Sequence, residues 1–383
     1  MQADWTGIAR VSASEDRETQ SSTLTSTQQR DTMLFSYLYL ILAQGEVTAM
    51  KNLMNQPEHY VDETLKGIYS AHPTRYCATG ENLRALIRAG TGGAPRVAVV
   101  TGGGSGHLPV FLGYVGEGLL AGCAVGNVFA SPPASTIETV ARAVHCEQGV
   151  LFVYGNYQGD VMNFEMAEEM AESSDIKVES VVINDDVAVE DSTYTAGRRG
   201  VGGTVLVEKL CGAAAERGAS LQKVTDLCKR CNDDVRSMGM ALTSCTVPAA
   251  GEPTFDLGED EMEIGIGIHG EPGRKRMEIE PADKVVERLM EPILEDLPFK
   301  EGDDVLLFMN SMGGTPLLEL YLAYRKAADI AEQHGLRVVR NLVGPYITSL
   351  EMAGISITMM RMNDKRVELW DAPVHTPGLR WGM

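Results

Sequence analysis

The chain has 383 residues, a formal net charge of -20 at pH 7 and a hydrophobic content of 44%. This length is sufficient for two domains with separate cores. The charge argues against a nucleic-acid binder and against docking on an anionic membrane, because no excess of basic side chains is present to neutralise phosphates. We therefore expect a small-molecule ligand or a protein partner.

The N-terminal part differs in composition from the rest. Residues 1–32 are polar and rich in Ser and Thr, which is typical of disorder. The apolar run "MLFSYLYLILA" (33–43) is too short to span a bilayer and is a poor signal peptide. Met50 resembles a natural start, so residues 1–49 are predicted to be disordered or an upstream-start extension.

Residues 96–192 repeat a pattern of short apolar strand, polar turn and helix. Strand candidates are residues 96–100, 149–155 and 177–183. A spacing of about 25 to 30 residues per unit is what βαβ crossovers require, so a parallel sheet is predicted. Ligands bind at the carboxyl ends of such strands. We therefore expect four residues of these turns to lie close together: Gly104, His107, Ser131 and Asp160.

The second half contains several segments with different predicted secondary structure. Residues 204–242 have the periodicity of two helices, and residues 245–273 suggest strands joined by tight turns. Further elements are predicted at 281–297 (helix) and at 304–310, 336–349 and 354–362 (strands). These patterns divide the chain into residues 50–192, residues 193–365 and a tail over 366–383. The family resemblance described below implies that the first two are α/β domains, and the tail is expected to pack on the first.

The cysteines do not form a disulfide framework. There are seven, an odd number without regular spacing. Cys228 and Cys231 form a Cys-x-x-Cys pair, but a zinc site would require a second pair. We expect reduced thiols and a cytoplasmic protein.

The loop "TGGGSGHLP" (101–109) is the first candidate ligand site. Its glycines allow close backbone approach and would supply N–H donors at a helix start. The spacing is not the dinucleotide Gly-x-Gly-x-x-Gly, so a dehydrogenase is set aside. A small polar or anionic ligand and a purely structural turn remain equally compatible. His107 favours the ligand, because an imidazole there can act as acid or base.

Other polar residues have simpler explanations when each is taken alone. Asp160 suits a helix N-cap, and Ser131 precedes a proline, as turn residues often do. The carboxylates of "INDDVAVED" (183–191) would suit Mg²⁺, although a solvated loop is favoured.

His269 lies in the glycine-rich stretch "GIGIHGEPG" (265–273). It is flanked by Gly267, Gly270 and Gly273, which suggests that space has been cleared for another molecule. A neutral imidazole nitrogen can attack a carbonyl carbon and form a covalent adduct.

Several blocks together resemble the dihydroxyacetone kinase family, and specifically its ketose-binding subunit. The resemblance covers residues 50–383 and rests on "GGGSGH", "GYVGEG", "NVFASPP", "GNYQGDVMNFEMA", "VINDDVAVEDSTYTAGRRGVGGTVLVEKLCGAAAERG", "CTVPAAGEPTF", "GIGIHGEPG" and "LWDAPVHTPGLRWG". It implies two α/β domains with mixed, largely parallel sheets flanked by helices, and a homodimer.

The resemblance also implies roles for single residues. His269 would hold the ketone carbon of dihydroxyacetone as a hemiaminal. His107 and Asp160 would handle the proton of the hydroxyl that is phosphorylated. Gly104 and Ser131 match substrate-contacting positions.

In this family a separate helical domain binds the nucleotide through Mg²⁺. We therefore expect no cofactor and no metal in this chain, with ADP or ATP and Mg²⁺ on a nucleotide-binding (DhaL-type) partner subunit. The split form implies recharging by a phosphocarrier of the phosphotransferase system, and an ATP-using partner is the alternative.

One departure concerns the substrate. Where the family has an acidic residue and then a histidine after "GGGSGH", this chain has "LPVFLGY", with Leu108, Phe111 and Leu112. If these residues line the ketose pocket, a larger ketose such as erythrulose is favoured; if they only pack, dihydroxyacetone stands. A ketose-sensing regulator is the other alternative. The presence of both His107 and Asp160 favours the enzyme.

Overall fold

The computed structural model describes residues 52–80, 83–90, 95–189 and 197–382. The predicted N-terminal extension (1–49) and the predicted domain boundary at 192–193 lie outside the described residues. Within the described part, no helix combines the length and apolar character needed to cross a membrane.

The first sheet has six strands in the order β1-β2-β4-β3-β5-β6. Strands β4, β3, β5 and β6 run parallel to one another, whereas β2 pairs antiparallel with both β1 and β4. The parallel core predicted from the βαβ spacing is therefore confirmed. The strands are β1 (Tyr76–Ala78), β2 (Ala85–Arg88), β3 (Ala98–Ser105), β4 (Gly122–Val128), β5 (Val150–Gly155) and β6 (Val178–Ile183).

The second sheet has the order β11-β10-β12-β7-β8-β9. Only β10 and β11 pair in parallel; the other neighbours are antiparallel. Its strands are β7 (Val235–Ala241), β8 (Glu261–Ile264), β9 (Lys275–Glu278), β10 (Asp304–Ser311), β11 (Arg337–Gly344) and β12 (Gly354–Arg361).

The helical prediction for residues 204–242 is wrong at its end. Helices α5 (Gly203–Glu216) and α6 (Leu221–Asp233) form as expected, but residues 235–241 form strand β7. Strand β7 pairs with β12 on one side and β8 on the other, so hydrogen bonds to distant strands decide its conformation. Local periodicity cannot report such partners.

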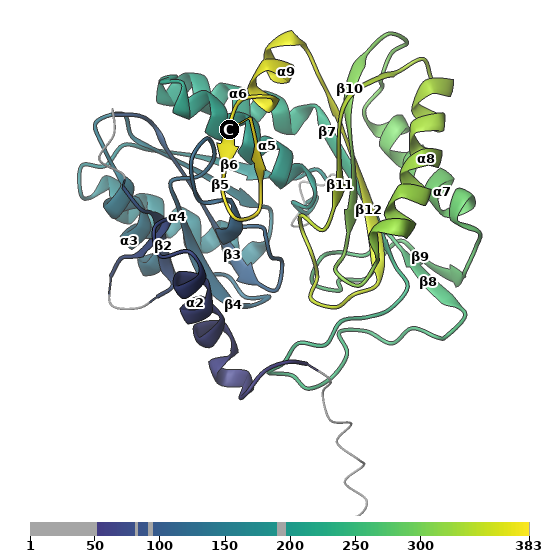
Figure 1. Ribbon diagram of the computed structural model, residues 1–383, viewed down its shortest axis with the longest axis horizontal. Helices are drawn as coiled ribbons and strands as arrows, with labels where there is room; N and C mark the ends of the chain where they lie inside the picture. Colours follow the sequence, from purple (N-terminus) through teal and green to yellow (C-terminus); the bar gives the residue numbers. More distant parts are fainter. Residues whose placement is uncertain (1–51, 81–82, 91–94, 190–196, 383) are drawn as a thin grey trace, which may run out of the picture. The chain divides into compact units, whose positions relative to one another are not determined.

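Helices and sheets alternate in layers (Figure 1). Helices α3 (Ala134–Val144) and α4 (Gln158–Glu172) cover the outer face of the first sheet. Helix α5 lies between the sheets and contacts strands of both, with α6 beside it. Helices α7 (Ala282–Asp296) and α8 (Leu317–Gln333) cover the second sheet's outer face. Three apolar cores result, one between the sheets and one beneath each outer helix pair.

The glycine-rich stretch does not open an α-helix as expected. After β3 the chain passes through a turn into a single 3₁₀ turn, η2 (Leu112–Tyr114). Val110, Phe111 and Leu112 are all buried, and a Cβ at Gly103 would overlap the Phe111 ring. Packing of this apolar turn against the strand therefore requires glycine at position 103.

The C-terminal tail contains α9 (Asp364–Trp370) and a hairpin of β13 (Val374–His375) and β14 (Arg380–Trp381). The Gly378 N–H donates to the Gly113 carbonyl at 2.9 Å. The buried Lys209 ammonium of α5 donates to the carbonyls of Leu369 and Ala372 at 3.0 and 3.1 Å. The tail thus packs on the turn that follows β3 and on α5.

Glu208 of α5 is a buried carboxyl in the central core, and burial raises its pKa to about 8. The unfolded chain ionises this group at much lower pH than the folded chain does. The free energy of unfolding therefore decreases as pH rises from about 5 to about 8. We expect Glu208→Gln to be more stable than the wild type by at least about 1 kcal/mol at pH 8, and nearly equal at pH 4. Urea unfolding at both pH values measures this, and equal differences at both would contradict it.

Candidate functional site

The predicted site residues meet where the two sheets' loops face each other. His107 follows β3, Ser131 lies between β4 and α3, and Asp160 lies in the first turn of α4 after β5. These are the carboxyl ends of neighbouring parallel strands. The loop between β8 and β9 brings His269 to the same place, with its imidazole 4.8 Å from that of His107 between ring centroids.

Gly104 lies at the end of β3, against the turn that follows β4. A Cβ at this position would be 2.7 Å from the Ala130 nitrogen and 2.9 Å from Phe129 backbone atoms. The glycine therefore allows two loops of the site to pack closely, and this packing alone accounts for Gly104.

His107 is a buried, neutral imidazole with a defined tautomer. Its side chain is 1% exposed, and Nδ1 donates to the Thr348 carbonyl at 2.7 Å. Burial, and then the neighbouring His269, lower the pKa of His107 to about 3. Its Nε2 has no hydrogen-bond partner among the described residues. This nitrogen is therefore free to accept a hydrogen bond.

Asp160 is the second buried group with a free acceptor. The residue is 7% exposed, and its Oδ1 has no hydrogen-bond partner in the described part of the chain. Burial raises its pKa to about 6, although the Ser131 hydroxyl and His269 act in the opposite direction. Asp160 does not serve as the helix N-cap, because that position is Tyr157. The structural explanation that the sequence offered for Asp160 is wrong.

Ser131 supports the aspartate from the neighbouring loop. Its hydroxyl lowers the pKa of Asp160, donates to the Pro132 carbonyl at 3.4 Å and accepts from the Asn163 amide at 3.1 Å. Asn163 lies one turn after Asp160 on α4, so helix and loop are joined at the carboxylate.

His269 is oriented by Glu271, two residues later in the same loop. Its Nδ1 donates to Glu271 Oε1 at 2.8 Å, and its backbone N–H donates to Oε2 at 3.0 Å. Burial would raise the pKa of Glu271, but the hydrogen bond from His269, together with the charge of Arg199, lowers it to about 2. Glu271 is thus a carboxylate, and it leaves the Nε2 of His269 as the nitrogen with a lone pair.

Aromatic side chains enclose the two imidazoles. The Phe129 ring stacks on His107 at 4.9 Å and 14°. The Tyr157 ring meets His269 edge to face at 4.6 Å and 84°. These contacts fix both ring planes. Neither ring was predicted from the sequence, although both residues stand in the blocks "NVFASPP" and "GNYQGDVMNFEMA".

The glycines beside His269 do not leave room for a ligand, contrary to the sequence-based interpretation. A Cβ at Gly267 would overlap the Glu271 carboxylate and the Arg199 guanidinium. Gly270 has a φ of +79° and lies against the Thr254 side chain. The loop is rich in glycine because neighbouring side chains fill the space that a Cβ atom would need, and because glycine tolerates the left-handed conformation.

The acidic run at 183–191 is not a solvated loop where it is described. Asp185 is fully buried and accepts hydrogen bonds from the backbone at the start of α5, at 2.6 and 2.8 Å. Asp186 pairs with Arg199 at 2.7 Å, and Arg199 also donates to the Gly265 carbonyl at 2.7 Å. Asp186 and Arg199 therefore hold the loop that carries His269. Among the described residues, no three His, Cys, Asp or Glu side chains are grouped to hold a metal ion.

The family is decided by comparison with known proteins. Residues 66–378 match the family model described as the Dak1 domain. The chain belongs to the dihydroxyacetone kinase family. It is 44% identical over 357 residues to the protein of Escherichia coli strain K12 named PEP-dependent dihydroxyacetone kinase, dihydroxyacetone-binding subunit DhaK, covering 87% of this chain and 100% of that protein. The resemblance to the ketose-binding subunits of this family is therefore confirmed.

Two further relatives carry names that describe different functions. The chain is 38% identical over 337 residues to the L-erythrulose kinase of Pectobacterium atrosepticum, covering 87% of this chain but 57% of that protein. A solved structure described as the dihydroxyacetone kinase operon co-activator DhaQ has a TM-score of 0.77 at 31% identity, covering 83% of this chain and 97% of that one. The same fold therefore occurs in proteins named as kinases and in one named as a co-activator.

Proposed function

We propose that this chain is the substrate-binding subunit of a dihydroxyacetone kinase. It holds dihydroxyacetone on His269 as a hemiaminal while a partner subunit transfers phosphate to a hydroxyl of the ketose. The observation that carries the proposal is the meeting of three groups: the available Nε2 of His269, and the two buried acceptors without partners, His107 Nε2 and Asp160 Oδ1.

The covalent step follows from the tautomer of His269. The Nε2 lone pair attacks the ketone carbon, a C–N bond forms, and the carbonyl π bond opens onto its oxygen. The ring becomes an imidazolium, which the Glu271 carboxylate stabilises at Nδ1. The imidazole then loses its Nδ1 proton and the ketone oxygen gains one, so the neutral hemiaminal contains all the atoms of the ketose. A polyol without a carbonyl cannot react.

The pKa values distinguish the two acceptors. General bases are most effective when their pKa is near the working pH. The pKa of Asp160 is about 6 and that of His107 about 3, so Asp160 is the better proton acceptor for the attacking hydroxyl. We assign proton removal to Asp160, and to His107 the orientation of the hydroxyl through a hydrogen bond to Nε2.

The phosphate donor is proposed to lie on another subunit. The relative in Escherichia coli is named as one subunit of a PEP-dependent kinase, which supports a split enzyme. A nucleotide-binding, DhaL-type partner would carry ADP or ATP with Mg²⁺, and a phosphocarrier of the phosphotransferase system would recharge it. This chain supplies the acceptor hydroxyl, its orientation and its base.

The structure bears on the choice between dihydroxyacetone and erythrulose. Leu108, Phe111 and Leu112 line a cavity to which none of the three catalytic candidates, His107, Asp160 and His269, contributes. The departure from the family pattern therefore lies in the lining of this cavity, and this supports dihydroxyacetone.

A regulatory function is the second candidate, because one structural relative is described as a co-activator. A sensor needs the covalent histidine but no base for phosphate transfer. Two buried acceptors held without partners are costly in free energy, and a sensor would have no use for Asp160 Oδ1.

The test is phosphate transfer from a partner subunit whose bound nucleotide carries the phosphate to be transferred. We expect dihydroxyacetone phosphate to form when this chain and the partner are both present, and not with either one alone. Retention of dihydroxyacetone without transfer in the complete mixture would assign the chain to the sensor class instead.

Glu271→Gln tests the orientation of His269 separately. The amide keeps a hydrogen bond to the ring but removes the charge that stabilises the imidazolium, so formation of the adduct is expected to slow by at least about tenfold. Time-resolved mass spectrometry with dihydroxyacetone measures this. Glu278→Gln, in the exposed strand β9, is the matched control, and an unchanged rate in Glu271→Gln would remove Glu271 from the mechanism.

A further inference from the structure

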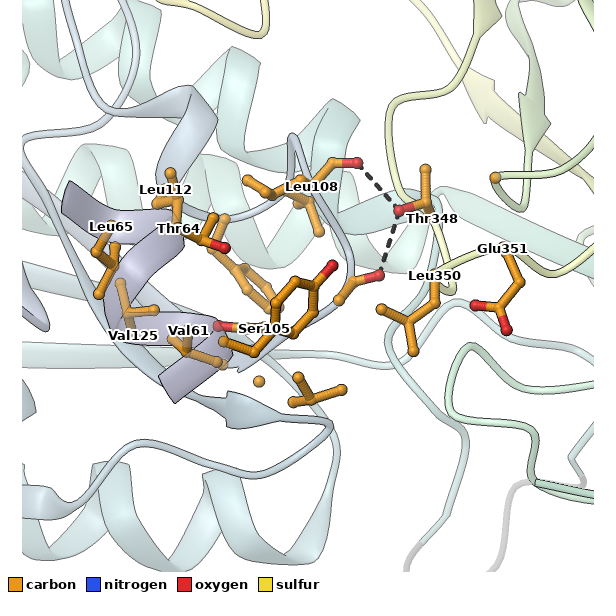
Figure 2. A pocket seen from close by; sticks show the side chains of 18 of the residues that line it. Val61, Thr64, Leu65, Ser105, Leu108, Leu112, Val125, Thr348, Leu350 and Glu351 are labelled. Atoms are coloured by element: carbon orange, nitrogen blue, oxygen red, sulfur yellow. Dashed lines mark hydrogen bonds between the residues drawn. The ribbon is translucent and has the colours of Figure 1, made fainter. Parts of the chain in front are cut away.

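A cavity lies beside the candidate ketose site and is not used by the proposed reaction. Its volume is about 460 Å³, a size typical of ligand pockets. Helix α2 (Tyr60–Ala71) forms one wall, and the turn after β3 forms another. Figure 2 shows Val61 and Leu65 of α2 on one side of the cavity, and Leu350 and Glu351 on the other.

The cavity is distinct from the ketose site but shares a wall with it. Gly104 and Gly106 line it, whereas His107, Asp160 and His269 do not. The Phe111 ring also lines the cavity, and it meets the His107 imidazole edge to face with centroids 6.5 Å apart. An occupant would therefore contact the same glycine-rich strand and the same aromatic ring that support His107.

Two hydroxyl groups of the wall are engaged within the protein. The Thr348 hydroxyl donates to the carbonyls of Leu108 and Gly106 at 3.0 and 3.3 Å, as the dashed lines in Figure 2 show. The Ser105 hydroxyl donates to the Gly126 carbonyl at 2.8 Å. Most of what remains for an occupant to contact is aliphatic or aromatic.

The charge of the wall limits the occupant further. No lysine, arginine or histidine is among the described residues that line the cavity. The one charged side chain is Glu351, whose Oε1 accepts a hydrogen bond from the Thr246 N–H at 2.8 Å. An anionic ligand would find no compensating charge and would be repelled by this carboxylate.

We propose that this cavity is a binding site for an uncharged, predominantly hydrocarbon small molecule, separate from the ketose site. Burial of apolar ligand surface against the walls supplies the affinity. The apolar run "LPVFLGY" builds the site, because Leu108, Val110, Phe111 and Leu112 all line it. The sequence feature that the ketose reaction leaves unexplained thus gains a role.

The experiment is a fluorescence titration of the full-length chain with the uncharged dye phenylnaphthylamine. Thr64→Phe places a ring in the cavity from α2, and Lys66→Phe adds the same ring on the exposed face of that helix. We expect saturable binding by the wild type and Lys66→Phe, and binding weaker by at least about tenfold in Thr64→Phe. Circular dichroism establishes that both variants are folded.

Matched competitors test the charge of the ligand. Naphthalenemethanol is expected to displace the dye, and naphthoate, its anionic counterpart, to require a concentration at least about tenfold higher. Equal displacement by both would overturn the assignment of an uncharged ligand.

Two results would overturn the site itself. One is the absence of saturable dye binding. The other is equal binding by Thr64→Phe and the wild type, which would place the dye elsewhere, for example on the exposed Leu317 and Leu318 of α8. His269→Ala is expected to bind the dye as the wild type does, so this outcome is independent of the ketose mechanism.

Discussion

His269→Ala is expected to abolish the covalent ketose adduct. Wild-type protein mixed with dihydroxyacetone should show a new intact mass, increased by one whole ketose because no water is lost in forming a hemiaminal. The variant should show only the mass of the free protein, since no other described imidazole in the site has a neighbouring carboxylate at Nδ1; that of His107 donates to a backbone carbonyl. Phosphate transfer should fall with the adduct, because the hydroxyl is no longer held in place.

The controls for this measurement follow from the chemistry. His59→Ala, at an exposed position before α2, should form the adduct as the wild type does. Glycerol should give no new mass, because it has no carbonyl carbon to attack. An adduct that persists in His269→Ala would transfer the covalent role to another residue, and an adduct with erythrulose but not with dihydroxyacetone would change the proposed substrate.

Asp160→Asn is expected to separate substrate capture from phosphate transfer. The amide cannot accept the hydroxyl proton, so kcat should fall by about 10² to 10⁴-fold, whereas the adduct on His269 should still form. In the wild type, the transfer rate should decrease as pH falls below about 6, because the carboxylate becomes protonated. Steady-state kinetics over a pH series measures both effects.

The same substitution should stabilise the fold. The pKa of Asp160 is raised by burial, so the folded state retains a proton that the unfolded state has lost, and stability decreases as pH rises from about 4 to about 6. Above this range the asparagine variant should be more stable by up to about 3 kcal/mol. Asp256→Asn, at an exposed position, should change neither activity nor stability. Loss of activity accompanied by loss of stability would mean that Asp160 has a structural role.

The sequence by itself determined the family, the α/β class and the residues that meet at the candidate site. The βαβ spacing was informative because parallel strands require long crossover connections, and it places the turns after β3, β4 and β5 at one edge. His269, the residue proposed to bind the ketose covalently, could be singled out from "GIGIHGEPG" because motif and resemblance agreed on it. These are properties of local pattern, which a sequence carries directly.

Only the tertiary structure decided what surrounds those residues. Strand β7 forms because two distant strands pair with it, and Asp185 is buried because the start of α5 offers its backbone N–H groups to the carboxylate. The raised pKa of Asp160 and the lowered pKa of His107 are caused mainly by burial, which depends on the packing of loops far apart in the chain. The cavity beside the site likewise exists only where α2 and the turn after β3 meet. Such features depend on distances between remote segments, and these distances become defined only when the chain is folded.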